Sequence, residues 1–323
     1  MKSDLNVSVA RFRYDAFGLS LLSEMEFSGL LPGLDTNEGD TVFIERGVVP
    51  RQLRTPFEIS GPIQATPDEC LLNYPGSCHI HVIGRERLVV ETETGADPAL
   101  LKTHILGAGL SIIGLRRGRL PLHTSAVAFG NQAIAFAGPS GGGKSTLAGY
   151  LVESGFELIA DDLCLLGFET PDTISIAPGI AELRLRDDAI QALGWIPEAR
   201  LAYQTNAAKS IFEAQRGKAH WFTLRSIYLL ERASPQVPAG IYRLEGIYAI
   251  RRLMTNLRVW SLLLGLSNPA KNLERLGRLV RQVPIYVFVR HWSLDHYAEE
   301  TDRLIEHFQT NVPTPPYPNA FAI

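Results

Sequence analysis

The sequence predicts an α/β protein in which a smaller β-rich N-terminal domain precedes a larger domain of mixed strands and helices. Three observations predict this fold class. The first hundred residues contain short apolar or alternating runs separated by glycine and proline, as is typical of strands and turns. From residue 120 onward, strand-like runs alternate with helical patterns. A glycine-rich stretch, Gly138–Thr146, lies between an apolar strand-like run and a helical one.

The composition is that of an ordinary globular protein. At 323 residues, the chain is long enough for two domains, or for one large domain with a sizeable core. Hydrophobic residues make up 46% and charged residues 20%. The net charge of −3 argues against a general nucleic-acid binder, which would carry a basic stripe. Three cysteines cannot form a full disulfide framework, and the N-terminus does not resemble a signal peptide. We therefore expect a cytoplasmic protein.

Residues 1–97 are predicted to form the β-rich N-terminal domain. No catalytic motif lies in this part of the chain, so we expect the domain to position the second one, to recognise a partner or to form a homo-oligomer. The expected strands are Val7–Tyr14, Thr41–Ile44, Phe57–Ile59, Cys78–Ile83 and Arg87–Thr92.

Cys78, His79 and His81 are of residue types that bind zinc. Successive side chains of a strand point to opposite faces, so His79 and His81 share one face and Cys78 lies on the other. Three ligands do not converge in that arrangement without a bend. Zinc is therefore the less favoured interpretation of this run.

Residues 98–119 are predicted to be a helical connector between the two domains. Pro98 suits the first turn of a helix, and Arg116 suits its last turn. The apolar run Leu100–Leu115 is interrupted by Lys102 and is too short to span a bilayer comfortably. We expect a buried helix here, and no association with a membrane.

Residues 120–310 are predicted to form the catalytic domain, which begins with a β-hairpin. A Gly-Asn dipeptide separates the apolar run His123–Phe129 from the strand that leads into the glycine-rich stretch. The expected hairpin register places His123 opposite Gly138, at the mouth of the glycine-rich loop. A lone histidine is more often structural, but this position favours a functional role.

The stretch Gly138–Thr146 fits the phosphate-binding P-loop pattern G-x-x-x-x-G-K-[ST]. Glycines allow successive backbone N–H groups to turn toward a phosphate at a helix N-terminus, where the helix dipole favours negative charge. We expect Lys144 to reach the outer phosphates and Ser145 to offer its hydroxyl to Mg²⁺. The residues expected to bind the nucleotide are Gly138, Ser140, Gly141, Gly142, Gly143, Lys144, Ser145 and Thr146.

Asp161 and Asp162 follow the apolar strand Phe156–Ala160. Only one helix and one strand separate them from Lys144. If their strand lies beside the P-loop strand, as in a βαβ unit, both acids lie near the phosphate site. The alternative is a solvated acidic turn. We expect one of the two acids to be a general base and the other a Mg²⁺ ligand, without an assignment of which is which.

Two arginines and a lysine are candidates for binding the acceptor. Glu182, Arg184 and Arg186 share one face of a predicted strand because side chains alternate along it. The arginines could clamp a phosphate or carboxylate, or could form a salt-bridged surface. Lys209 lies in the segment 197–220, which lacks clear periodicity and is predicted to be a mobile substrate loop or a linker.

The rest of the chain returns to regular structure, and residues 311–323 are predicted to be a loosely packed Pro-rich tail. The expected elements are strands Ser226–Leu230 and Ile285–Val289 and helices Leu244–Leu264, Asn272–Arg281 and Leu294–Phe308.

A P-loop next to a pair of carboxylates predicts phosphoryl transfer from ATP with Mg²⁺, to a hydroxyl of the acceptor. The residues expected to take part in catalysis are Asp161, Asp162, His123 and Lys144. Two alternatives remain. One is a small-metabolite kinase, although the hairpin before the P-loop and the β-rich first domain count against it. The other is a regulator that binds ATP without turnover. The presence of all of these catalytic residues argues against it.

These motifs resemble the catalytic domain of the HPr kinase family. The similar features are the hairpin that begins at His123, the loop Gly138–Ser145 and the apolar strand that ends in Asp161-Asp162. Within that family, the chain is similar to the branch that includes lasso-peptide kinases, with Leu122-His-Thr-Ser-Ala-Val before the loop. The resemblance implies a fold related to PEP carboxykinase and ATP-dependent phosphorylation of a serine in a precursor peptide. The family's Glu-x-Arg-Gly signature is replaced here by Glu182-Leu-Arg-Leu, which counts against HPr as the acceptor.

Overall fold

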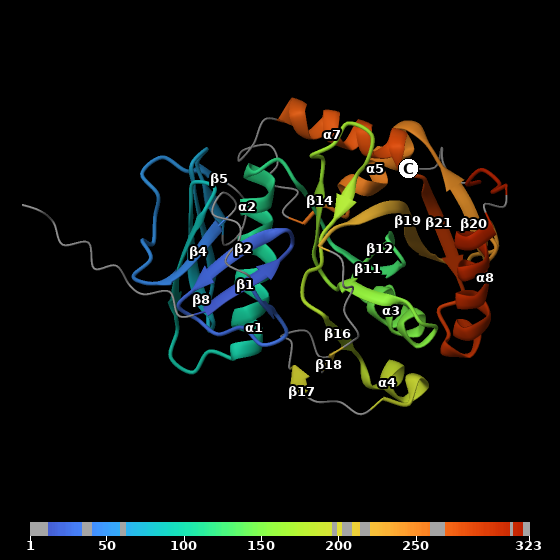
Figure 1. Ribbon diagram of the computed structural model, residues 1–323, viewed down its shortest axis with the longest axis horizontal. Coiled ribbons are helices and arrows are strands. Elements are labelled where there is room, and N and C mark those ends of the chain that lie inside the picture. The colour runs from blue at the N-terminus through green and yellow to red at the C-terminus, as the bar shows by residue number, and fades with distance from the viewer. Residues whose placement is uncertain are drawn as a thin grey trace, which may run out of the picture. The chain divides into compact units, whose positions relative to one another are not determined.

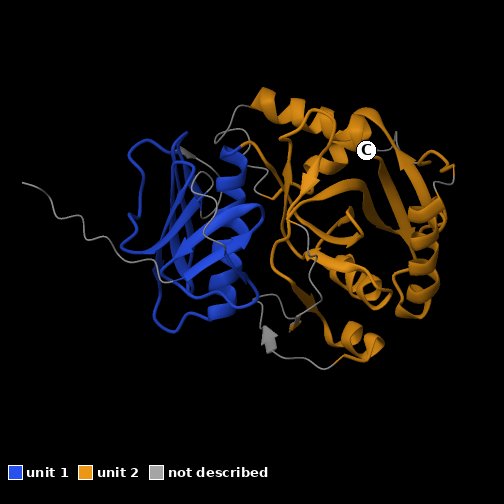
Figure 2. Cartoon of the chain, viewed as in Figure 1, with its two compact units in different colours: residues 1–117, 261–268 blue, residues 118–260, 269–323 orange. Residues whose placement is uncertain are grey.

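The computed structural model describes residues 12–33, 41–58, 63–195, 199–201, 209–213, 220–258, 269–310 and 313–318. These fall into two compact units, which meet in the sequence between Arg117 and Gly118 (Figure 2). Each unit contains a large β-sheet, and the second also carries several helices (Figure 1). The chain is therefore a mixed α/β protein.

The first unit is built on a nine-stranded sheet in the order β3-β1-β2-β4-β9-β8-β7-β6-β5. Most neighbouring strands are antiparallel, but β4 runs parallel to both β2 and β9. The predicted strand that starts at Val7 begins outside the described residues. The strands are β1 (Phe12–Ala16), β2 (Leu19–Ser23), β3 (Leu31–Pro32), β4 (Thr41–Arg46), β5 (Phe57–Glu58), β6 (Ile63–Ala65), β7 (Glu69–Tyr74), β8 (Cys78–Ile83) and β9 (Arg87–Thr92).

Strand β8 contains Cys78, His79 and His81, the three residues considered above as zinc ligands. Cys78 is fully buried, whereas His79 and His81 lie on the opposite face, where their rings are 3.3 and 3.4 Å from Glu93 and Glu69. Burial raises the pKa of the Cys78 thiol to about 11, so this sulfur stays protonated. The predicted alternation is confirmed, since Cys78 lies on the other face of β8 from His79 and His81.

A helical segment follows, made of α1 (Pro98–Thr103), η2 (His104–Gly109) and α2 (Leu110–Arg116). The side chain of Asp97 caps its N-terminus by accepting from the N–H of Ala99. By length and composition the segment could cross a membrane, but 67% of its apolar stretch is buried inside the protein. The predicted buried helix is confirmed, and as far as Arg117 the predicted connector is grouped with the first unit.

The second unit is built on a sheet in the order β10-β14-β15-β19-β12-β11-β13, with β21 beside β19 and β20 beside β21. Strands β12, β19 and β21 are parallel to one another. A small sheet in the order β16-β18-β17 accompanies it. The strands are β10 (Leu120–Leu122), β11 (Thr124–Phe129), β12 (Gln132–Ala137), β13 (Glu157–Ala160), β14 (Cys164–Gly167), β15 (Ser175–Ile176), β16 (Glu182–Leu185), β17 (Ala199–Leu201), β18 (Lys209–Glu213), β19 (Phe222–Arg232), β20 (Gly240–Leu244) and β21 (Ile285–Arg290).

Helices α3 and α8 share a hydrophobic core with this sheet. The helices of the unit are α3 (Lys144–Glu153), α4 (Asp187–Leu193), α5 (Gly246–Met254), α7 (Pro269–Gln282), the short η3 (Leu294–His296) and α8 (Tyr297–Thr310). Leu151 of α3 and Leu304 of α8 are fully buried in one cluster with Phe136 of β12. Full burial of a leucine stabilises the fold by about 1.5–3 kcal/mol, so this packing holds α3 against β12.

Four expectations about this unit were wrong in detail. The helix predicted over Leu244–Leu264 is present but shorter within the described residues, since Leu244 ends strand β20, α5 spans Gly246–Met254 with Gly246 at a φ of +58°, and residues 259–264 lie outside the described part of the chain. The irregular segment 197–220 contributes β17 and β18. In the tail, residues 315–317 pair with Arg243, and Tyr317 is buried rather than loosely packed. Strand β13 is not a neighbour of β12, because β11 lies between them.

Candidate functional site

The glycine-rich loop, residues 138–143, connects β12 to α3. Gly141 and Gly143 have φ angles of +78° and +82°, which favour glycine. A Cβ on Gly138 would lie 3.2 Å from the carbonyl oxygen of Leu230 in the neighbouring strand β19. No side chain caps the N-terminus of α3 within the described residues. The backbone N–H groups of the first turn can therefore bind an anion, as the sequence predicts for this position.

Lys144 is the first residue of α3, and its side chain is buried over the loop. Its ammonium group donates to the carbonyl oxygens of Gly138 and Pro139, at 2.9 and 3.1 Å. The positive charge therefore lies at the loop itself. Of the other predicted nucleotide ligands, Ser140 is exposed in the loop and Thr146 is half-buried in the first turn of α3.

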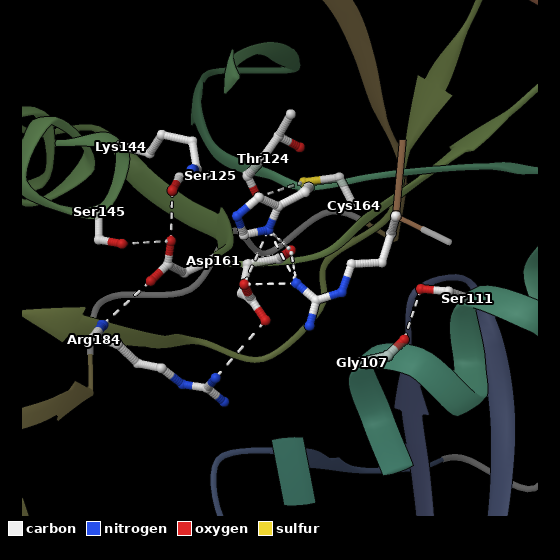
Figure 3. A network of polar contacts seen from close by, with 12 residues as sticks. Gly107, Ser111, Thr124, Ser125, Lys144, Ser145, Asp161, Cys164 and Arg184 are labelled. Carbon is white, nitrogen blue, oxygen red and sulfur yellow. Dashed lines mark hydrogen bonds and ion pairs between the residues drawn. The ribbon is translucent and has the colours of Figure 1, made fainter. Parts of the chain in front are cut away.

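Asp161 lies directly after β13 and faces the start of α3 (Figure 3). Its Oδ1 accepts a hydrogen bond from the hydroxyl of Ser145 at 3.0 Å, and a second from the hydroxyl of Ser125. Its Oδ2 accepts from the backbone N–H of Arg184 at 3.2 Å. The carboxylate therefore joins β11, β16 and α3 at the edge of the loop.

Asp162 faces a different set of partners, although it is the next residue. Its Oδ1 lies 3.0 Å from Nδ1 of His123 and 2.8 Å from Nη1 of Arg258. Arg184 approaches its Oδ2 at 3.8 Å. Asp162 has a φ of +74°, an uncommon backbone conformation outside glycine that turns its side chain away from the Asp161 side.

The surroundings of Asp162 keep it ionised. Burial alone would raise the pKa of this carboxyl group, but the hydrogen bond from His123 and the positive charges of Arg258, of His123 when it is protonated, and of Arg184 outweigh that effect. Together they hold the pKa of Asp162 well below its usual range. Asp162 is therefore a fixed negative charge among cationic groups.

Arg258 reaches the site through a short backbone pairing. The N–H of His123 donates to the carbonyl oxygen of Asn256 at 2.8 Å, and the N–H of Arg258 donates to that of Pro121 at 2.9 Å. Leu122 and Leu257 form a β-bridge between these two contacts. The segment that follows α5 is thereby held alongside the start of the hairpin, and the guanidinium of Arg258 lies 3.0 Å from the ring of His123.

Two further side chains contact the outside of the glycine-rich loop. Arg290, at the end of β21, is buried and donates to the carbonyl oxygen of Gly142 at 3.0 Å. The hydroxyl of Tyr297, at the start of α8, donates to the carbonyl oxygen of Gly143 at 3.2 Å. The guanidinium of Arg290 also lies over the ring of Tyr297, 4.8 Å from its centre. These donors bind carbonyl groups of the loop and not its N–H groups; of the latter, the N–H of Gly142 donates within the loop to the carbonyl oxygen of Pro139 at 3.0 Å.

The predicted site residues are thus brought together only in part. The hairpin register is confirmed, since Thr124 pairs with Ala137 and His123 precedes this pair. Arg184 reaches both acids. Arg186 does not, because its side chain is exposed and lies 3.6 Å from Asp188. The side chain of Lys209 lies outside the described residues.

Two residues of the site were not predicted. Ser125 could have been suggested by alternation, because it lies two residues after His123 and so on the same side of β11. Arg258 had no such signal, because it lies 96 positions from Asp162 in the sequence and inside a run expected to be helical.

The site offers hard oxygen donors for a divalent cation. Among the described residues there is no group of three or more histidines, cysteines, aspartates and glutamates that could hold a metal on its own. Asp161 and Ser145 provide one carboxylate and one hydroxyl. This donor set fits Mg²⁺, which prefers oxygen ligands and often keeps several waters or phosphate oxygens in its coordination shell.

Comparison with known proteins leaves the family open. No protein family model matches the sequence, and no curated protein matches it. Among solved structures, the HPr(Ser) kinase/phosphatase from Coxiella burnetii is similar over 58% of this chain and 90% of its own, with 12% sequence identity and a TM-score of 0.32. A likeness this distant establishes neither the family nor the activity.

Proposed function

We propose that this protein is an ATP- and Mg²⁺-dependent kinase that transfers a phosphoryl group to a hydroxyl. The observation that supports the proposal is that the two adjacent acids, Asp161 and Asp162, face different sets of side chains. Asp161 faces Ser145 and the glycine-rich loop, whereas Asp162 faces His123 and two arginines. A kinase needs both environments, one for the metal and phosphates and one for the acceptor hydroxyl.

In this proposal the glycine-rich loop is a P-loop that binds the phosphates of ATP through its N–H groups and Lys144. Asp161 and Ser145 hold Mg²⁺, which would neutralise charge on the phosphates when bound. Ser125 orients Asp161 through its hydrogen bond. Arg290 and Tyr297 keep the loop carbonyl groups turned away from the nucleotide.

The second environment handles the acceptor proton. Both oxygens of Asp162 that lie near Nδ1 of His123, in its carboxylate and its backbone carbonyl, can only accept hydrogen bonds. In the proposed mechanism the ring is neutral, with its hydrogen on Nδ1 and directed at Asp162; Nη1 of Arg258 also lies 3.0 Å from this nitrogen, and Nε2 keeps its lone pair. As the acceptor oxygen attacks the γ-phosphorus and the bond to ADP breaks, the hydroxyl proton passes to Nε2. The fixed negative charge of Asp162 stabilises the resulting imidazolium.

Arg184 and Arg258 supply positive charge next to this pair. In the transition state the negative charge is spread over the oxygens of the moving phosphoryl group, and fixed cations stabilise it. The same arginines are suited to hold an acidic acceptor. We propose a serine of a precursor peptide of the lasso type as the acceptor, because the motifs around His123 and Asp161-Asp162 resemble that branch of kinases.

Mass spectrometry tests the function directly. The full chain is incubated with Mg-ATP and either short peptides that end in serine or a set of small hydroxyl metabolites, with Lys144→Ala as the inactive control. We expect a mass increase of one phosphate, about 80 Da, on a peptide serine, in the wild-type reaction only. Transfer to a metabolite instead would support the small-metabolite kinase. ATP binding with no transfer to any acceptor would support the non-catalytic regulator and overturn the kinase proposal.

A further inference from the structure

The segment 291–296, which follows strand β21 and leads into α8, lies beside the glycine-rich loop. The residues on either side of it both contact that loop. Arg290 donates to the carbonyl oxygen of Gly142 at 3.0 Å, and the hydroxyl of Tyr297 donates to that of Gly143 at 3.2 Å. A Cβ on Gly143 would lie only 2.8 Å from Nη2 of Arg290. Both ends of the segment are therefore held against the loop.

The order of the strands places this segment on the other side of the loop from the two acids. Strand β12, which leads into the loop, has β19 and then β21 on one side, and β11 and then β13 on the other. Asp161 follows β13 and His123 precedes β11, whereas the segment 291–296 follows β21. The parallel strands β12, β19 and β21 point toward the same edge of the sheet, which is where α/β sheets bind ligands.

This arrangement gives a direction to a bound nucleotide. In the proposed kinase, the γ-phosphate meets the acceptor beside Asp162 and His123, so the nucleoside end of ATP extends the other way, toward β19 and β21. Two loops lie in that direction, 233–239 after β19 and 291–296 after β21. The first loop has no aromatic residue, whereas the second contains Trp292 and two histidines. The aromatic surface on this side of the phosphate site therefore comes from the segment 291–296.

Trp292 has the exposure that a stacking surface needs. Its relative exposure is 44%, so part of the indole is open to solvent. It lies two residues after Arg290, at most about 7 Å along the backbone from a residue that contacts the loop. The neighbouring side chains of His291 and His296 are also exposed, and their rings lie 4.7 Å apart. A flat indole in this position can stack on a nucleobase, which has a π-face of its own.

The backbone around Trp292 is held in place by contacts within the chain. The N–H of His291 donates to Oε1 of the buried Glu300 at 2.8 Å, and Nδ1 of the His291 ring is 3.2 Å from the same oxygen. The hydroxyl of Ser293 accepts from the N–H of Asp295 at 3.3 Å and so caps η3. The residues before and after Trp292 are therefore fixed, and a ligand that binds there loses little affinity to the ordering of the segment.

We propose that Trp292 is the platform on which the base of the nucleotide stacks, and that the segment 291–296 forms the nucleoside part of the nucleotide site. This inference rests on the proposed function, because it needs a nucleoside triphosphate on the glycine-rich loop. Every base has a π-face, so stacking adds affinity for a nucleoside without selecting one base. The segment therefore distinguishes a nucleotide from an inorganic phosphate chain.

Two probes separate the base from the phosphates. Isothermal titration calorimetry on the full chain measures the binding of ATP and of inorganic tripolyphosphate, each with Mg²⁺. We expect Trp292→Ala to weaken ATP by about tenfold or more and to leave tripolyphosphate unchanged, because only ATP carries a base. Trp292→Phe should keep the ATP affinity within about threefold of the wild type, since a flat ring remains. The matched control is Phe129→Ala, which removes an exposed aromatic ring at the far end of β11 and should change neither affinity.

Tryptophan fluorescence gives a readout that a merely structural role of Trp292 would not change. The chain has four tryptophans. We expect Mg-ATP, but not tripolyphosphate, to quench part of their emission, and we expect this quenching to be absent in Trp292→Phe although that variant still binds ATP.

The outcomes distinguish this inference from the kinase proposal. An unchanged ATP affinity in Trp292→Ala, equal losses for ATP and tripolyphosphate, or full quenching in Trp292→Phe would overturn the stacking assignment while leaving the kinase proposal intact. If neither probe binds to the wild type, the glycine-rich loop is not a phosphate site, and both proposals are overturned.

Discussion

The hydroxyl oxygen of Ser145 lies 3.0 Å from Oδ1 of Asp161, so the first turn of α3 is directly joined to the end of β13. The two residues are 16 positions apart in the sequence. This contact places a hydroxyl of the first turn of α3 and a carboxylate together at the edge of the glycine-rich loop. It defines where a divalent cation fits among the described residues, and the first prediction follows from it.

Removing either oxygen donor should abolish the dependence on Mg²⁺. We expect Asp161→Asn and Ser145→Ala each to lower the rate of phosphate transfer by about 10²-fold or more, because charge on the phosphates is then no longer neutralised. The measurement is a rate against Mg²⁺ concentration. Asp172→Asn, at an exposed acid, is the control and should leave the curve unchanged. Normal Mg²⁺ activation in Asp161→Asn would contradict this assignment.

Changing His123 should alter how the rate depends on pH. If Nε2 of His123 accepts the hydroxyl proton, His123→Gln lowers the rate by about 10²–10⁴-fold and removes the fall in rate on the acidic side of the profile. Asp162→Asn should have a similar effect, since the neutral amide no longer stabilises the imidazolium. A pH–rate profile with single-turnover kinetics measures both. An unchanged acidic limb in His123→Gln would mean that another group accepts the proton.

Variants of Arg258 and Arg186 compare an arginine of the candidate site with an arginine of the surface. Arg258 contacts Asp162 at 2.8 Å, whereas the side chain of Arg186 is 59% exposed. We expect Arg258→Gln to lower the transfer rate by about 10–10³-fold, because a fixed positive charge is lost next to the reacting groups. Arg186→Gln should change neither the rate nor the acceptor affinity. A larger effect at Arg186 than at Arg258 would show that the acceptor binds near the start of α4 rather than beside His123 and Asp162.

The stability of the protein should depend on Asp162 in acid. The folded-state pKa of this group is depressed below its unfolded value of about 3.9, so its contribution is complete above that pH and is lost as the pH falls toward the folded value. We expect Asp162→Asn to be less stable than the wild type at pH 5, because Arg258 loses its partner. The difference in the free energy of unfolding should shrink as the pH is lowered to 3. A difference that stays constant over this interval in denaturant titrations would contradict the ion pairing.

Tyr297 should support nucleotide binding through the loop backbone. We expect Tyr297→Phe to weaken ATP binding by about threefold to tenfold, since one hydrogen bond to the carbonyl of Gly143 is lost while the aromatic packing remains. The control is Tyr242→Phe, which removes a hydroxyl that contacts the carbonyl of Pro238 at 3.0 Å. Calorimetric titration with Mg-ATP measures both. Equal affinities in the two variants would show that the loop does not need this contact.

Much of the candidate site could be predicted because its parts follow local rules. Glycine spacing between a strand and a helix indicated the loop, and a Gly-Asn dipeptide set the hairpin register that places His123 before the Thr124 and Ala137 pair. The two acids stood out because they end an apolar strand. Their proximity to the loop was expected for the wrong reason, since β11 separates β12 from β13 and itself supplies Ser125.

The sequence by itself determined which side chains could carry the chemistry, because glycine conformation, strand alternation and turn type act over a few residues. Only the tertiary structure decided that Asp161 and Asp162, although adjacent, face Ser145 and His123 respectively. That choice depends on a positive φ at Asp162 and on a backbone pairing that brings Arg258 to the hairpin from a distant segment. Contacts between segments so far apart have no local period, so no pattern in the sequence predicts them.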